Sequence, residues 1–423
     1  MKAYRRWLCI VLIVLLGAGV ALAQQDDLQP GRLALIGADS NVYVIVEDGS
    51  AQALTSDAGA AGDMLRFYQW PTWSQAGALA FFGAQISRPA SVSFEMWVAE
   101  NGGVPEAVYS AEDETFTYAY WSPSLCPEGG ACNSVAALIG VRGEDGFTLR
   151  RIPADGSAAP VLGRGSPFYF DWSPDGAQMA WHRNNGGIEL ANPATGAITR
   201  TIDVLSGASA APAWSPDGTE LVYGAVEETR ETTALAVFDG TSERIIASGL
   251  EGLISFAWSP DGSTIAYLEQ NGPLVVVDAV TGEEQARSEI EDIIAFFWSP
   301  AGGQIAFIIP VDAQPEGSFS AKRLGLPDQQ PSLARLAWLV LNVEEGTSAR
   351  VATFAPTREE AYFLTYFDQF SRSHRVWSPD GTRIVYGEML AANRPVVQVI
   401  DLAQPGSPPQ IVAQGVVGIW SFE

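Results

Sequence analysis

Basic residues are scarce in this sequence, and their scarcity excludes one class of partner. The 423 residues include 24 Lys and Arg against 49 Asp and Glu, and only Lys2 and Lys322 are lysines. A formal net charge of −25 repels phosphate groups, whereas nucleic-acid binding relies on clustered Lys and Arg. We therefore expect no nucleic-acid partner and no binding to anionic membranes.

Histidine and the short motifs of common enzyme classes are also rare or missing. The two histidines are His182 and His374, and several-histidine metal sites cannot be built from two. The sequence has no Gly-x-Ser-x-Gly elbow, no Gly-x-x-x-x-Gly-Lys-Ser/Thr phosphate loop and no His-Glu-x-x-His zinc motif. We therefore predict a protein that is not an enzyme and uses no cofactor and no metal. A hydrolase or lyase acting through two carboxylates is the catalytic alternative.

Cysteine occurs three times, and one of the three lies in an N-terminal apolar run. The other two, Cys126 and Cys132, enclose the segment Pro-Glu-Gly-Gly-Ala. In an oxidising compartment such a close pair is typical of a local disulfide that closes a loop. A zinc site would need further ligands nearby, and the segment supplies none. We predict a Cys126–Cys132 disulfide.

Long hydrophobic runs are limited to one, over residues 7–23. Three basic residues precede it, and it ends in Ala-Leu-Ala, which is the order of a secretory signal. The alternative is an uncleaved membrane anchor, although 17 apolar residues are near the lower limit for a bilayer. We predict a signal peptide over 1–23 and a single domain over 24–423 that does not insert into a membrane. The expected location is secreted or periplasmic, or the extracellular side of a bacterial envelope.

A short motif recurs along most of the chain. Trp-Ser occurs eight times, and four copies read Trp-Ser-Pro-Asp-Gly in full. From Trp172 to Trp298 the mean spacing is 42 residues, the length of one four-stranded propeller blade. Equivalent positions in every repeat indicate packing between blades for Trp and a turn for Asp, rather than function. The tryptophans are Trp73, Trp121, Trp172, Trp214, Trp258, Trp298, Trp377 and Trp420.

Each motif begins a regular alternation of strands and turns. In the repeat at Trp258 we expect strands over 254–258, 264–268 and 274–278 and a short fourth strand, with Ser-Pro-Asp-Gly forming the first turn. A single four-stranded sheet cannot bury both of its faces. Neighbouring sheets must therefore stack, and closing them into a ring removes the exposed ends.

The two ends of the sequence complement each other. Residues 417–423 form a first strand with nothing after it, and strands over 33–37, 42–47 and 52–55 supply the remainder of that blade. The 79 residues between Trp298 and Trp377 contain no further Trp-Ser, so we assign them one blade with two insertions. We predict an all-β, eight-bladed β-propeller of four-stranded antiparallel blades whose C-terminal strand pairs with the N-terminal strands. Seven blades is the alternative.

The repeated Trp-Ser-Pro-Asp-Gly-x-x-Ile-Ala-Tyr style of unit resembles the WD40-like PD40 repeat of the TolB-like propeller family. The resemblance covers nearly all of residues 24–423. It implies the propeller fold, and it is less specific for function, because that family includes periplasmic interaction proteins as well as the propeller parts of peptidases.

Loop lengths single out one face of such a ring. Turns between strands two and three and connections between blades emerge on the same face, which we call the long-loop face. The opposite face has short turns, apart from the loop between the two cysteines. Long loops on a rigid scaffold usually carry binding. The insertions expected on the long-loop face are 56–69, 83–93, 224–232, 310–335 and 357–372.

The insertion over 357–372 has the clearest internal pattern. Thr357 and Glu360 are spaced as a capping box, and aromatic residues follow at helical spacing. One interpretation is a helix that packs its aromatics onto the propeller and plugs the channel, so that its removal destabilises the protein. The other is an aromatic wall for a ligand, with a second lip over 63–70. The candidates for partner binding are Tyr362, Tyr366, Phe367, Asp368, Phe370, His374, Phe67 and Trp70.

These observations predict a monomeric, non-enzymatic propeller that binds a protein or peptide through its long-loop face. A carbohydrate-binding or sensor propeller that uses aromatic stacking is the first alternative. The carboxylate-based hydrolase or lyase is the second.

Overall fold

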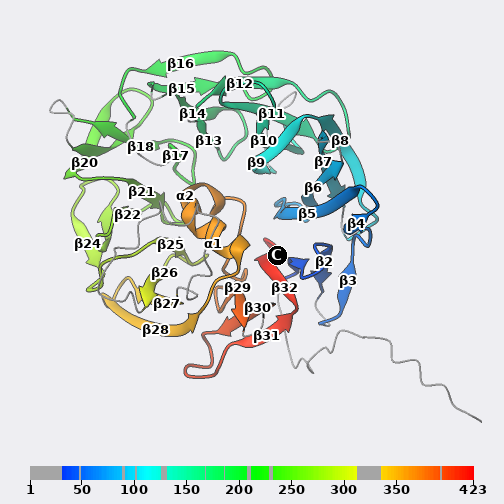
Figure 1. Cartoon of the computed structure of the whole chain (residues 1–423). Helices are drawn as coiled ribbons and strands as arrows, with labels where there is room; N and C mark the ends of the chain where they lie inside the picture. Colours follow the sequence, from blue (N-terminus) through cyan, green and yellow to red (C-terminus); the bar gives the residue numbers. More distant parts are fainter. Residues whose placement is uncertain are drawn as a thin grey trace, which may run out of the picture.

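The computed structural model of the chain is a ring of eight antiparallel sheets (Figure 1). It describes residues 31–46, 49–87, 91–100, 102–124, 131–166, 168–184, 186–206, 211–227, 232–311, 335–390 and 393–423. The predicted signal peptide over 1–23 and Cys126 lie outside these ranges, so the cleavage and the disulfide to Cys132 stay predictions. No helix in the described part of the chain is long and apolar enough to cross a membrane.

The first four blades are built from the N-terminal half of the chain and the last strand. Blade 1 contains β32 (Gly415–Trp420), β1 (Leu33–Gly37), β2 (Val42–Ile45) and β3 (Ala51–Ala53). Blade 2 contains β4 (Gly59–Ala61), β5 (Met64–Trp73), β6 (Leu79–Ser87), β7 (Ser91–Ala99) and β8 (Glu106–Glu112). Blade 3 contains β9 (Glu114–Trp121), β10 (Ser134–Val141), β11 (Phe147–Pro153) and β12 (Val161–Gly165). Blade 4 contains β13 (Phe168–Trp172), β14 (Met179–Arg183), β15 (Ile188–Ala191) and β16 (Ile198–Ile202).

The other four blades follow in chain order. Blade 5 contains β17 (Ala213–Trp214), β18 (Leu221–Val226), β19 (Thr233–Phe238) and β20 (Glu243–Leu250). Blade 6 contains β21 (Ile254–Trp258), β22 (Thr264–Glu269), β23 (Leu274–Asp278) and β24 (Glu284–Arg287). Blade 7 contains β25 (Ala295–Trp298), β26 (Gln304–Val311), β27 (Arg335–Asn342) and β28 (Thr347–Phe354). Blade 8 contains β29 (Arg383–Leu390), β30 (Arg394–Asp401) and β31 (Gln410–Ala413), and its inner strand is reduced to one bridge between Trp377 and Ile384.

The ring closes as the sequence predicts. The C-terminal strand β32 lies antiparallel to β1, with Leu33 opposite Trp420 and Ile36 opposite Val417 (Figure 1). Leu33 and Trp420 are buried together in one core cluster with blade 8. The eight-bladed prediction is therefore confirmed, and the seven-bladed alternative is wrong.

The motif tryptophans join neighbouring blades. The indole Nε1–H of Trp258 donates to the carbonyl of Ala213 in the preceding blade at 3.0 Å, and Trp377 donates to Phe297 at 3.0 Å in the same way. Trp121 and Trp298 repeat this contact with their own preceding blades. The other four motif tryptophans have no hydrogen-bond partner for Nε1 among the described residues, so packing of the indole between blades is what all eight repeats share.

Within the motif, Ser and Asp build the turn. In the repeat at Trp258, the Ser259 hydroxyl donates to the Asp261 carboxylate at 2.6 Å and accepts the Thr264 N–H at 3.0 Å. Gly262 has a φ of +74°, and a Cβ placed on it would lie 3.4 Å from Pro216 of the preceding blade. The positive φ favours glycine, whereas a contact of this length could be made by an ordinary Cβ. The motif aspartates are therefore turn residues, as their repetition predicts.

Two of the predicted loop insertions are paired strands instead. Residues 56–69 contain β4 and the first half of β5, and residues 83–93 extend β6 and β7. Blade 2 consequently has strands of up to 10 residues, and its hairpins project beyond the neighbouring blades on the long-loop face. Both segments contain alternating apolar residues, a pattern that is typical of a strand. The length of each segment alone did not distinguish a longer hairpin from a loop.

Candidate functional site

A helical insertion covers the centre of the ring on the long-loop face (Figure 1). It consists of α1 (Arg358–Thr365) and α2 (Phe367–Phe370) and connects β28 with the inner strand of blade 8. The Thr357 hydroxyl caps α1 by accepting the Glu360 N–H at 3.1 Å. α1 contacts β29 and β32, and α2 contacts β21 and β25, so the insertion lies against the inner strands of blades 1, 6 and 7 and against β29 of blade 8.

The capping box is only half formed, because Glu360 faces the propeller. Its side chain is 2% exposed, and its Oε2 accepts the Gly387 N–H of β29 at 3.0 Å. Oε1 has no hydrogen-bond partner among the described residues. Burial raises the pKa of Glu360 to about 8, so the carboxyl is mostly protonated at neutral pH. The predicted reciprocal bond to the Thr357 N–H is absent, since that N–H donates to the Gly387 carbonyl.

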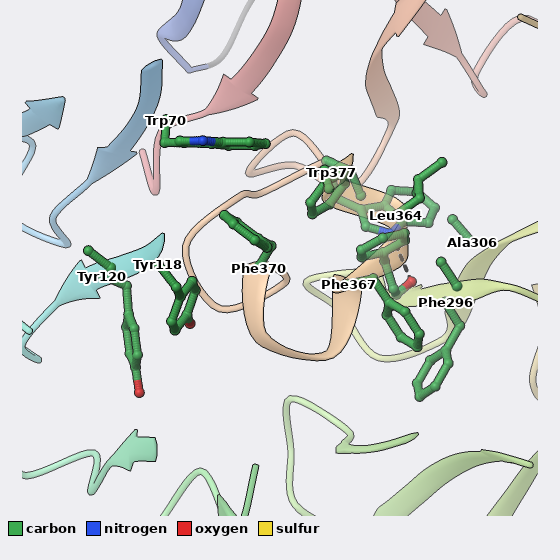
Figure 2. Close-up of a cluster of buried hydrophobic side chains, with 14 of the residues drawn as sticks. Trp70, Tyr118, Tyr120, Phe296, Ala306, Leu364, Phe367, Phe370 and Trp377 are labelled. Atoms are coloured by element: carbon green, nitrogen blue, oxygen red, sulfur yellow. Dashed lines mark hydrogen bonds between the residues drawn. The ribbon is translucent and has the colours of Figure 1, made fainter. Parts of the chain in front are cut away.

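The inner face of the insertion is a plug. Phe363, Leu364, Phe367 and Phe370 are all buried, and Phe367 lies edge-on to Phe296 of β25. Figure 2 shows Phe370 projecting from α2 between Trp70 and Tyr118, with ring centroids 4.7 and 5.2 Å away. The Tyr118 hydroxyl donates to the Gln369 carbonyl at 2.6 Å. Two predicted binding residues, Phe367 and Phe370, therefore lie in the core, where a partner cannot contact them.

His374 is buried in the same aromatic cluster. Its ring stacks on Phe363 at 5.6 Å and lies edge-on to Trp70 and Phe370. Its Nδ1 is 2.7 Å from the Ser373 hydroxyl, and burial lowers its pKa to about 3. An imidazole of this kind is neutral at physiological pH and is a weak base. His182 of β14 is likewise buried and stacks on Tyr169 of β13.

The outer face of the insertion carries two exposed tyrosines. Tyr362 is 41% exposed and Tyr366 is 47% exposed, and their rings lie 5.1 Å apart. Tyr362 also packs on Trp70 at 5.4 Å. Trp70 has a φ of 52° at an irregularity in β5, a backbone conformation that a bulky residue rarely adopts. This conformation aims the indole at the insertion and supports the exposed tyrosine pair, while Phe67 lies half-buried further along β5.

A buried ion pair anchors the C-terminal side of the insertion. Arg372 pairs with Asp171 of β13, and its guanidinium also donates to the carbonyls of Ala211 and Pro212. Asp171 accepts the Tyr120 hydroxyl at 2.7 Å and the Trp214 N–H at 3.0 Å. The Asp171 carboxylate holds the Arg372 pKa above its ordinary value against the effect of burial. The sequence analysis did not identify this pair, although an Asp directly before a motif Trp, where the other repeats have Ala, Phe, Val, Thr, Tyr or Ile, was a usable signal.

Asp368 differs from Asp171 in having no salt bridge within the described chain. Burial raises its pKa, and the nearby Arg372 guanidinium opposes the shift. Burial is the main cause of the raised pKa values of Tyr118 and Tyr169, and the nearby Asp368 charge raises both further. No group of three or more His, Cys, Asp or Glu side chains in the described ranges is arranged to hold a metal ion.

Exposed apolar side chains are concentrated on the long-loop face. The described chain has 13 exposed large hydrophobic residues. Four lie on outermost strands, Val161, Ile198, Ile245 and Ile411, and two lie in turns of the opposite face, Val104 and Val280. The other seven lie on the long-loop face: Met64, Leu65, Ile86, Leu205, Leu253, Tyr362 and Tyr366.

Comparison with known proteins establishes the fold and nothing narrower. No family model and no curated protein matches the chain. Among solved structures, a eukaryotic initiation factor is similar with a TM-score of 0.51 at 8% identity, covering 93% of this chain and 98% of that one. The C-terminal WD40 domain of Sif2 has a TM-score of 0.48 at 14% identity, and the match covers 79% of this chain and 81% of that one. TolB from Acinetobacter baumannii has a TM-score of 0.37 at 13% identity, and the match covers 85% of this chain and 82% of that one.

Proposed function

We propose that this propeller is a non-catalytic binding module that takes a protein or peptide partner on its long-loop face. The observation that carries the proposal is the distribution of exposed large apolar residues, seven of 13 on this face and two on the opposite one. Exposed apolar side chains gathered on one surface are typical of protein interaction sites. Tyr362 and Tyr366 are the aromatic members of this set, and large aromatic residues contribute most to binding at interfaces.

The chemistry at the centre of the ring supports binding rather than catalysis. His374 is buried and neutral, so it is poorly suited to act as a general base near pH 7. Asp171 is already engaged by Arg372, Tyr120 and the Trp214 N–H. A two-carboxylate hydrolase needs a second acidic group free to act beside Asp368, and Asp171 is not free. The apolar run over 7–23 supports a location outside the cytoplasm.

The proposal is tested by removing the tyrosine pair. We expect Y362S/Y366S to lose bound polypeptide in cross-linking from the native envelope or secreted fraction, while V104S/V280S on the opposite face retains it. The two double variants each remove two exposed apolar side chains, so a loss of non-specific hydrophobic binding would affect both variants equally. Equal capture by wild type and Y362S/Y366S would refute the proposal.

A carbohydrate partner is the second candidate, because the exposed rings of Tyr362 and Tyr366 can stack on a sugar. The same variants on a glycan array distinguish the two candidates. Binding to a glycan that depends on the tyrosines, with no polypeptide captured, would assign the face to carbohydrate.

A further inference from the structure

Exposed carboxylates surround the long-loop face. On blades 1 to 3, arginines pair with some of them: Arg66 pairs with Asp57 and Glu95, Arg142 with Asp113, and Arg164 with Glu144. Asp63, Glu112 and Asp145 on these blades are exposed and form no salt bridge within the described chain. On the other side, five exposed carboxylates in the connections between blades 4 and 7 form no salt bridge within the described chain: Asp203, Glu251, Glu289, Glu291 and Asp292. We call these five residues the acidic arc.

Exposed leucines accompany the acidic arc. Leu205 is two residues from Asp203, and Leu253 is two residues from Glu251. Their exposed fractions are 45% and 54%, which is high for leucine. Each connection from blade 4 to blade 6 therefore presents one carboxylate and one apolar side chain to solvent.

The helical insertion lies directly inside the acidic arc. Arg372 contacts the carbonyls of Ala211 and Pro212 in the connection from blade 4 to blade 5, and α2 contacts β21 and β25, which follow the next two connections. The guanidinium of Arg372 is neutralised by Asp171, so it does not offset the surrounding carboxylates. Tyr366, which lies between α1 and α2, extends the exposed apolar surface toward the centre of the ring.

From this arrangement we propose that the partner on the long-loop face is a cationic polypeptide segment with apolar side chains, lying along the acidic arc from Leu205 past Leu253 to Tyr366. Its Lys or Arg side chains pair with the carboxylates of the acidic arc, and its apolar side chains cover the two leucines and the tyrosine. On such a surface, the unpaired carboxylates select a partner of positive charge, and burial of the exposed apolar groups contributes to the affinity for that partner. The inference rests on the proposed function and adds the chemistry of the partner.

The test uses the purified protein and two synthetic peptides that alternate Leu with Lys or with Glu. We expect the Lys–Leu peptide to bind, with an affinity that falls as ionic strength rises from about 0.05 to about 0.5 M. The Glu–Leu peptide should not bind. The triple variant D203N/E251Q/E291Q should weaken Lys–Leu binding about tenfold, from the summed loss of three exposed charge pairs. L205S/L253S should weaken it by a similar factor.

The matched control removes the same number of charges from the opposite face. E106Q/E283Q/E345Q replaces three exposed carboxylates at the ends and turns of strands three and four. We expect this variant to bind the Lys–Leu peptide within twofold of wild type. Equal weakening by both triple variants would overturn the inference, because it would mean that the peptide responds only to net charge.

Other results also overturn the inference and leave the proposed function separately testable. If the Glu–Leu peptide binds as tightly as the Lys–Leu peptide and Y362S/Y366S abolishes both, the face binds polypeptide but the charge assignment is wrong. If neither peptide binds and sedimentation shows a dimer that L205S/L253S dissociates, the occupant is a second copy of the chain. If neither peptide binds and the protein stays monomeric, the partner is not a cationic segment.

Discussion

Because the folded propeller holds the Glu360 carboxyl in its protonated form, the stability of the propeller should fall as the pH rises above about 5. The carboxyl is buried under α1 with one hydrogen bond, and its pKa is raised from 4.5 to about 8. Between these two values the folded protein keeps a proton that the unfolded chain has released. Stability is therefore fully present below pH 4.5 and is lost as the pH rises through the folded pKa.

The size of the effect follows from the width of this window. Each pH unit between the two pKa values changes the free energy of unfolding by about 1.4 kcal/mol, so the window from 4.5 to about 8 corresponds to a loss on the order of 5 kcal/mol. E360Q keeps the shape of the protonated carboxyl and cannot ionise. The difference between E360Q and wild type should therefore grow with pH in favour of the variant, at about 1.4 kcal/mol per unit.

The assay is urea unfolding of both proteins at pH 5, 6, 7 and 8, followed by tryptophan fluorescence. Taking the difference between the two proteins removes contributions from other groups, including Glu388, whose pKa is also raised by burial, and Tyr386, which senses both carboxylates. Glu359 lies one residue earlier in α1 and is less buried, so E359Q is the matched control. Hydrogen exchange of the α1 amides shows whether the helix separates from β29 before the ring unfolds.

A difference between wild type and E360Q that stays constant from pH 5 to pH 8 would refute this reasoning. So would E359Q reproducing the effect, because the cause would then be helix charge rather than burial. If the protection factors of the α1 amides fall with pH in wild type and not in E360Q while global unfolding is unchanged, the loss is confined to the plug, and the pKa assignment still holds.

Four further changes have expected outcomes. F370A should cost about 3–5 kcal/mol in urea unfolding by leaving a cavity between α2 and the ring. H374F should remove an acid-side loss of stability that develops as the pH falls from 6.5 toward the folded pKa of about 3, because only the unfolded state gains the proton there. W258F should lower stability by about 1–3 kcal/mol more than W214F, because the Trp258 indole N–H donates across blades and that of Trp214 has no hydrogen-bond partner among the described residues. The hydrogen bond from the Ser259 hydroxyl lowers the pKa of Asp261 in the folded protein, so the stability that Asp261 contributes is present above its unfolded pKa and falls on acidification. D261A should therefore lose less stability than wild type between pH 6 and pH 3, as thermal unfolding would show.

The sequence predicted the scaffold because every feature of the scaffold repeats. The strands expected at 254–258, 264–268 and 274–278 are found at Ile254–Trp258, Thr264–Glu269 and Leu274–Asp278. In the four full copies of the motif, Ser and Asp form the same turn contacts, and Trp-Ser itself recurs eight times, so the copies reinforce one interpretation. Ring closure followed from counting strands at the two ends, and it required no knowledge of side-chain contacts.

The site was harder to predict because its contacts join residues far apart in the chain. Arg372 meets Asp171, and the Glu360 carboxyl meets the Gly387 backbone rather than its own helix cap. Helical spacing correctly placed aromatic residues on the insertion, but it could not say that Phe367 and Phe370 face the ring while Tyr362 and Tyr366 face solvent. That division depends on how α1 and α2 dock onto four different blades.

The same physics explains why function in this fold resides in departures from the repeat. A position that recurs eight times is constrained by packing between neighbours, as Trp258 and Ser259 illustrate. Asp171, the φ of Trp70 and the insertion over 357–372 each break the pattern, and all three meet at the centre of one face. The ring holds these exceptions in place because each is bonded to it or packed against it: Asp171 accepts the Trp214 N–H, and Tyr362 packs on Trp70. Only the exposed side chains of this anchored surface, such as Tyr366, can vary to suit a partner at little cost to the stability of the blades.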